Sequence, residues 1–224
     1  MSVFTIVAIL VALTIIGIVI WRLTSKSSPT DPGTVRLVEG SMSGKTQRSA
    51  PGSLPRSFNQ SQGATFTYTG WLLFNDFTFN YGQKRLIFSK GDCPGVYLDS
   101  TSNGILVVVD TYGSQESILI SNLPARKWIH FGLVVDQDSV DVYINGVIRQ
   151  HHTLAQLPKQ NDKAVALGSD SVGWDGVLSG LTYQSRSLTA SEIDALSKTV
   201  PVDDMHVAPS APQYFDMSWY TGRV

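Results

Sequence analysis

The sequence predicts an all-β fold, a two-sheet antiparallel jelly-roll sandwich over residues 64–198. Short apolar segments recur at short intervals, with Gly, Pro, Asn or Asp between them, which is typical of sandwiches and barrels. The chain has 224 residues and 19 glycines, a content that suits many turns. Asn145-Gly146 stands between two strand patterns, as expected for a type I′ hairpin turn.

The predicted strands follow one another from Thr65 onward, in the segments TFTYTGWLLF, RLIFS, GVYLD, GILVVVD, SILIS, WIHFGLVVD, SVDVYIN, VIRQHHTL, AVALGS and GVLSGLTYQ. A short helix is expected at 189–198. Thr189 precedes Glu192 by three residues, which is the spacing of a capping box. Ile193 and Leu196 then give the helix a narrow apolar face. The sandwich should therefore end in a short C-terminal helix.

Residues 1–23 are predicted to form a transmembrane anchor. Val3–Trp21 carries no charged side chain, and as a helix it would span about 28 Å at ~1.5 Å per residue. A cleaved signal peptide is the alternative, but it would need a basic start and a small-x-small cleavage site, and neither is present. The sequence therefore favours a single-pass membrane protein that contacts the bilayer through Val3–Trp21.

The charges that flank this segment predict its orientation. Arg22 and Lys26 follow the apolar run, whereas no basic side chain precedes it. The positive-inside rule then places the C-terminal bulk on the cytosolic side. Residues 24–63 are rich in Ser, Pro and Gly and are interpreted as a flexible linker. Asn59 begins a glycosylation sequon in this linker, which is usable only if the domain is lumenal.

Residues 199–224 are interpreted as a C-terminal tail that becomes aromatic toward its end. The aromatic side chains are Tyr214, Phe215, Trp219 and Tyr220. Two interpretations stay open: the rings pack back onto the sandwich, or they form a docking segment, since aromatic residues are enriched at interface hot spots.

Taken together, the motifs identify a family resemblance over about residues 64–198. The segments FTYTGWLLF, LIFSKGDCPGVYLD, KWIHFGLVVD, VDVYINGV and WDGVLSGLTYQSRSLTASEIDAL occur in this order. In combination they resemble a laminin-G-like, concanavalin A-like lectin/glucanase jelly roll. The resemblance implies two stacked antiparallel sheets. The family includes enzymes, sugar binders and structural modules, so the fold alone does not select a function.

Catalysis is not expected. The glucanases of this family use alternating carboxylates on one strand, roughly 5 Å apart. The chain has three glutamates, Glu39, Glu116 and Glu192, and none belongs to such a motif. Cys93 is a single cysteine, which favours a loop residue over a nucleophile. The net charge of −1 provides no basic field for nucleic acid.

The resemblance also implies two kinds of binding site. Calcium, the one cofactor considered, would be held at the rim of the sandwich by Asp99, Asp170 and Asp175. A carbohydrate site would need exposed aromatic rings, for which the candidates are Trp71, Tyr97, Tyr112 and Trp174. Trp71 stands in an apolar run that favours a core position, and Trp174 is the best loop aromatic, with covering the edge of the sandwich as its alternative role.

The sequence favours a non-enzymatic structural or adhesive protein that tethers a protein assembly to a membrane. This arrangement resembles that of membrane-anchored structural proteins in large DNA viruses with an internal membrane. The resemblance implies capsid proteins as the partners and the virion as the location. The alternative is a lectin-like, carbohydrate-binding module that faces the lumen or cell exterior. The predicted cytosolic orientation favours the first, since complex glycans lie mainly on the other side.

Overall fold

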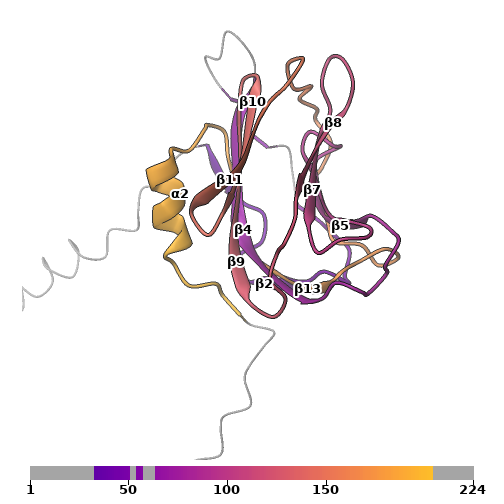
Figure 1. Cartoon of the computed structure of the whole chain (residues 1–224). Coiled ribbons are helices and arrows are strands. Elements are labelled where there is room, and N and C mark those ends of the chain that lie inside the picture. Colours follow the sequence, from indigo (N-terminus) through magenta and orange to yellow (C-terminus); the bar gives the residue numbers. More distant parts are fainter. Residues whose placement is uncertain (1–32, 51–53, 58–63, 204–224) are drawn as a thin grey trace, which may run out of the picture. The chain divides into compact units, whose positions relative to one another are not determined.

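The computed structural model describes residues 33–50, 54–57 and 64–203. They form two antiparallel sheets that pack face to face (Figure 1). Sheet A has the order β1-β13-β4-β9-β10-β11, with β2 also paired to β13. Its strands are β1 (Thr34–Arg36), β2 (Ser41–Ser43), β4 (Thr65–Asp76), β9 (Trp128–Asp136), β10 (Ser139–Ile144), β11 (Val147–Thr153) and β13 (Asp175–Gln184).

Sheet B has the order β3-β12-β5-β6-β7-β8. Its strands are β3 (Arg48–Ser49), β5 (Arg85–Ser89), β6 (Gly95–Leu98), β7 (Ile105–Val109), β8 (Glu116–Ile120) and β12 (Ala166–Leu167). In Figure 1, sheet A lies between sheet B and the helix α2 (Ala190–Ser197). The predicted all-β, two-sheet antiparallel sandwich is confirmed.

The core lies between the two sheets and is built from the alternate residues of each strand. Tyr68 of sheet A stacks on Phe88 of sheet B, with ring centroids 5.2 Å apart. Phe131 meets the same Phe88 ring edge-on at 6.2 Å. All three rings are fully buried or nearly so. Burial of such large rings on both inner faces is the main force that holds the layers together.

Two local predictions are confirmed by backbone geometry. Asn145 and Gly146 have φ values of 51° and 79°, the paired positive angles that a type I′ turn requires. Thr189 caps α2: its hydroxyl accepts from the Glu192 N–H, while the Glu192 carboxylate accepts from the Thr189 N–H. Both orphan amides at the start of the helix are thereby satisfied.

Helix α2 covers the outer face of sheet A. Ile193 is completely buried there, in a cluster with Val134, Tyr143 and Leu188. Gly132 on β9 makes the contact possible, since a Cβ at this position would lie 3.3 Å from the Ile193 side chain. The helix therefore belongs to the folded domain, as the sequence predicted.

The predicted linker differs from the structure. Residues 33–50 supply three strands: β1 and β2 pair with β13, and β3 pairs with β12. Leu37, Val38 and Met42 are buried among them. These strands are two or three residues long, and their partners lie more than a hundred residues away. The composition of this segment is that of a linker, but its pairing with distant strands makes it part of the edges of the sandwich.

Several predictions fall on residues that the structure does not describe. They are the membrane span Val3–Trp21, the sequon at Asn59, and the tail aromatics Tyr214, Phe215, Trp219 and Tyr220. The structure lends the anchor no support. Within the described ranges, none of the helices meets the length and hydropathy that a membrane span requires.

Candidate functional site

Tyr112 has the most exposed aromatic ring among the described residues. It lies in the loop between β7 and β8, and 73% of its surface is accessible. Its backbone is held all the same: the Tyr112 N–H donates to Leu157 O at 3.0 Å, and Lys159 N–H donates to Asp110 O at 2.8 Å. Thr111 also forms an isolated bridge with Pro158. The loop is thus pinned to segment 155–160 along its length.

The turn that carries Tyr112 is organised by the Thr111 hydroxyl. This hydroxyl donates to Ser114 O at 2.7 Å and accepts from the Gly113 N–H at 3.1 Å. Gly113 leaves room for Gln156, whose Cγ would lie 2.9 Å from a Cβ at position 113. A ring on such a loop is presented in a fixed place at little further entropic cost, because the backbone is already ordered.

Polar and charged groups lie near the ring. Arg56 makes two hydrogen bonds of 2.7 Å to the Asp162 carboxylate. This contact raises the pKa of Arg56 and lowers that of Asp162, and the Tyr112 phenol adds a small electrostatic contribution at Arg56. We call Tyr112, Leu157, Gln156, Arg56 and Asp162 the Tyr112 surface. It combines an exposed ring with planar groups that can donate and accept hydrogen bonds.

The segment that carries Asp162 is tied to sheet B. Asn161 donates from its side-chain amide to Lys90 O at 2.7 Å, and the Lys90 ammonium donates back to Asn161 O. Burial lowers the pKa of Lys90. This reciprocal pair holds Asn161, the residue before Asp162, against sheet B. Sequence reasoning proposed Tyr112 but not Arg56, Gln156, Leu157 or Asp162, since no local motif links segments so far apart in the chain.

Trp174, the preferred loop aromatic, is not at the surface, and that prediction was wrong. Its side chain is fully buried, and its ring centroid lies 5.1 Å from that of Phe74. Gly44 and Gly176 make the space, because a Cβ at either position would clash with the indole. Gly176 lies close to Trp174 in the sequence, but Gly44 is 130 residues away, so no local pattern indicated that the ring is buried.

The other two aromatic candidates are only partly accessible. Trp71 lies on the outer face of sheet A, where it meets His130 edge-on at 5.1 Å. Tyr97 lies on the outer face of sheet B; its hydroxyl donates to Asp92 at 2.5 Å and Lys84 covers its ring at 4.3 Å. Of the four predicted sugar-contact residues, Tyr112 alone presents a largely free ring.

The three aspartates of the predicted calcium site are not brought together. Asp99 accepts from the Ser102 hydroxyl and two backbone amides of its own turn. Asp170 accepts from the Gln47 N–H at 2.6 Å, and Asp175 pairs with Lys45 at 3.2 Å. The described residues contain no group of three or more side chains placed to hold a metal. The structure therefore gives this site no support.

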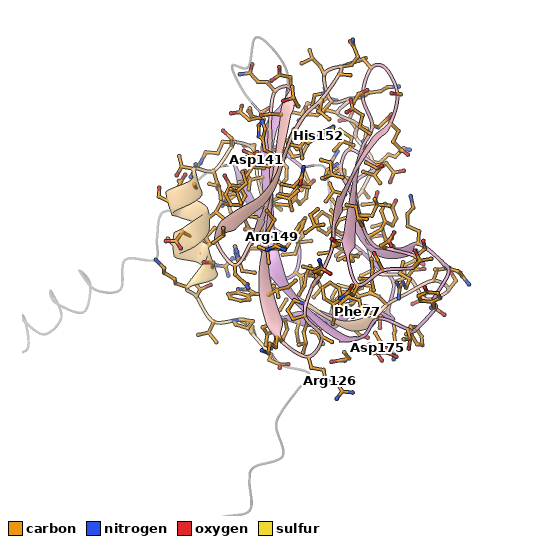
Figure 2. The ribbon with its side chains drawn as sticks, viewed as in Figure 1. Phe77, Arg126, Asp141, Arg149, His152 and Asp175 are labelled. Carbon is orange, nitrogen blue, oxygen red and sulfur yellow. The ribbon has the colours of Figure 1, made fainter. Side chains whose placement is uncertain are left out.

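Several other titratable side chains have structural partners. Glu116 and Glu192 are occupied by His152 and Arg186, at 2.7 Å in each case. The adjacent histidines point to opposite faces, as expected in a strand: His152 reaches toward sheet B, whereas His151 meets Asp141 on the side of α2 (Figure 2). Burial raises the pKa of Cys93 to about 12, so its thiol stays protonated and is a poor nucleophile.

The sequence of residues 46–194 matches the model of the concanavalin A-like lectin/glucanases superfamily. The chain belongs to this superfamily. The match covers most of the sandwich and agrees with its two-sheet architecture. A search of curated proteins gives no match.

Solved structures share the superfamily fold at low sequence identity. The binding domain of Paraclostridial Mosquitocidal Protein 1 has a TM-score of 0.56 and 16% identity, with 74% of this chain and 45% of that one covered. The receptor-binding domain of botulinum neurotoxin D has a TM-score of 0.55 and 13% identity, covering 74% and 43%. The chain thus spans less than half the length of either, and the likeness shows the fold alone.

Proposed function

We propose that the chain is a non-catalytic carbohydrate-binding module that uses Tyr112 as its stacking platform. The observation that carries the proposal is the 73% exposure of this ring on a loop whose backbone is pinned on both sides. An exposed aromatic face packs well against the apolar face of a sugar ring, and nearby planar polar groups then fix its orientation. Arg56, Asp162 and Gln156 provide such groups beside the ring.

A further solved structure supports this choice. It is described as showing that cell entry of botulinum neurotoxin type C depends on interaction with two ganglioside molecules. It shares 15% identity with this chain, with a TM-score of 0.50 over 60% of this chain and 35% of that one. The support is therefore at the level of a shared sandwich that serves recognition, and the residues proposed for this chain come from its own geometry.

The test is binding to a glycan array by the full chain in detergent, followed by titration of the best ligand. Tyr112→Ala should lower the affinity about tenfold or more, since stacking and desolvation of one ring contribute a factor of this size. Tyr81→Ala is the matched control, because Tyr81 is a second exposed tyrosine, on a different loop. An array on which no glycan is retained, or equal effects of the two substitutions, would contradict the proposal.

The proposed module is tethered to a membrane through Val3–Trp21, with the sandwich in the lumen or outside the cell. This is the opposite side from the one that Arg22 and Lys26 favour. Glycosylation of Asn59 in eukaryotic cells decides the side: a mass shift removed by a glycosidase means a lumenal domain. An unmodified Asn59, together with digestion of the sandwich by protease added to the cytosolic side of intact membranes, would contradict the lumenal placement.

The second candidate is a structural tether that links a membrane to a protein assembly, such as a capsid around an internal membrane. The aromatic cluster within Gln213–Val224 favours it, because such clusters form interface hot spots. Deletion of Gln213–Val224 should then abolish association with the assembly while the sandwich stays folded. An unfolded truncated chain would instead mean that the tail belongs to the core.

A further inference from the structure

Strand β8 is an open edge of sheet B that lacks the usual protection against pairing. It hydrogen-bonds to β7 on one side, in unbroken register from Glu116 to Ile120. From Ser117 to its end at Ile120, and in the following Ser121, it has no charged residue and no proline. Natural proteins blunt long edges with charges, prolines or bulges, because an exposed edge is a template for another strand.

The other described edges are protected. On β11 the register shifts opposite Val142 and Tyr143, so that Arg149 forms a bulge, and Arg149 and His151 are both exposed. At the far edges, β1 and β2 have three residues each and β3 has two. Among the described strands, β8 is therefore the edge best suited to accept a partner strand.

Three exposed aliphatic side chains lie beside this edge, in a groove that Ser121, Arg149 and Gln150 also line. Leu119 points outward with 50% of its surface exposed, and across a groove lie Val147 and Ile148, at 64% and 46%. The groove has a volume of about 320 Å³ and runs between the end of β8 and residues 147–150 of β11. Side chains of this size exposed together beside an unpaired edge indicate a surface that is covered in use.

The sequence of the edge identifies the partner. Residues 117–121 read Ser-Ile-Leu-Ile-Ser in both directions. If two copies pair antiparallel about Leu119, Ser117 meets Ser121, Ile118 meets Ile120, and Leu119 meets Leu119. Ile118 and Ile120 are buried on the core side and Leu119 is exposed on the outer side. Each side chain would then face a like partner on the same sheet face, as stable cross-strand pairs require.

Electrostatics do not oppose this pairing. Glu116 is the one charged residue of β8, and its carboxylate already binds His152 and the Ala155 N–H. In the antiparallel register the two copies of Glu116 fall at opposite ends of the junction, about 20 Å apart at ~3.3 Å per residue. At that distance salt screens the repulsion.

We propose that β8 pairs with β8 of a second copy about a two-fold axis through Leu119, which joins the two B sheets into one. The dimer covers Leu119 and narrows the groove beside Ile148. It is independent of the carbohydrate site, since the Tyr112 ring lies in the loop before β8 and not on the edge itself.

Cysteine pairs test the register in the full chain in detergent. Ser117→Cys and Ser121→Cys chains, mixed and mildly oxidised, should form a covalent dimer, because opposing Cβ atoms lie about 5 Å apart. Either variant alone should cross-link poorly, since like positions are then offset by about 13 Å. Native Cys93 is buried, so the wild-type chain gives the background level of cross-linking. No cross-link in the mixture, or equal cross-linking of each variant alone, would overturn the proposal.

A charge at the axis tests the interface itself. Leu119→Lys places two ammonium groups face to face and should raise the dimer dissociation constant about tenfold or more. Size-exclusion chromatography with light scattering at several protein concentrations measures the dissociation constant, and circular dichroism verifies the fold. Val200→Lys is the control, a charge at another exposed residue. A Leu119→Lys chain that keeps the wild-type oligomeric state, or a monomeric wild-type chain, would overturn the proposal.

Discussion

His152 Nε2 lies 2.7 Å from a carboxylate oxygen of Glu116 and so joins the open edges of the two sheets. The second carboxylate oxygen accepts from the Ala155 N–H at 2.8 Å. The hydrogen bond from His152 holds the pKa of Glu116 below its usual value, although partial burial opposes this. This contact between β8 and β11 thus depends on an ionised Glu116.

We predict that Glu116→Gln lowers the free energy of unfolding at pH 7 by about 1 kcal/mol, through loss of a charge-assisted hydrogen bond. Because the native-state pKa is depressed, the wild-type contribution is present above pH 4.5 and is lost as the pH falls through the folded value. Urea titrations at several pH values measure it. Asp138→Asn, an exposed carboxylate in the β9–β10 turn, should leave the profile unchanged.

His130 should make the protein sensitive to mild acid. It is 2% exposed, and burial lowers its pKa to about 4 from 6.5. As the pH falls below 6.5, this histidine becomes protonated in the unfolded chain but stays neutral in the folded chain. The free energy of unfolding therefore decreases between pH 6.5 and 4. The loss amounts to ~3 kcal/mol at most. His130→Phe should flatten this part of the profile, which urea denaturation at several pH values between 4 and 7 measures.

Trp174 and Gly44 should show strong energetic coupling. Trp174→Ala should cost about 4 kcal/mol, as expected for a large buried ring. Gly44→Ala should cost about 2 kcal/mol in the wild-type chain, because the new methyl group clashes with the indole. In a Trp174→Ala background the same change should cost far less. Additive effects in urea denaturation would show that Gly44 is required for another reason.

Arg85 should be irreplaceable by lysine. Its guanidinium is fully buried and donates to Phe77 O at 2.6 Å, to Phe79 O at 2.8 Å and to Asp99 O. A lysine has no planar fork to reach all three carbonyls. Both Arg85→Lys and Arg85→Met should therefore destabilise the fold by about 3 kcal/mol.

The control for this prediction is Lys84→Met, since Lys84 is exposed and contacts only the Tyr97 ring among the interactions described. It should change the unfolding free energy by less than about 1 kcal/mol. Increased proteolysis of the β4–β5 loop in the Arg85 variants would show that the loss is local. This loop lies at the end of the sandwich marked by Phe77 and Asp175, away from His152 (Figure 2).

What could be predicted from the sequence is local. The Asn145-Gly146 turn and the Thr189 cap each depend on residues a few positions apart, and both are confirmed. The alternation of apolar residues along β4, β9 and β10 likewise predicts the inner face of sheet A. These features follow from backbone preference and side-chain period, which a single segment contains.

What could not be predicted depends on distant segments. Strand β1 forms because it pairs with β13, where Thr34 lies opposite Gln184. Its three residues have no strand pattern of their own. Trp174 is buried because Gly44, far earlier in the chain, clears its space. The polar part of the Tyr112 surface comes from residues 56 and 156–162, which only the folded chain brings beside Tyr112.

Both ends of the described chain attach to one strand. Thr34 pairs with Gln184 at one end of β13, and Ser179 in the same strand donates its hydroxyl to Val202 O at 2.6 Å. The β7–β8 loop belongs to the other sheet. A fluorophore or other label attached at residue 34 or residue 202 would therefore be held on sheet A, whereas the Tyr112 loop extends from sheet B.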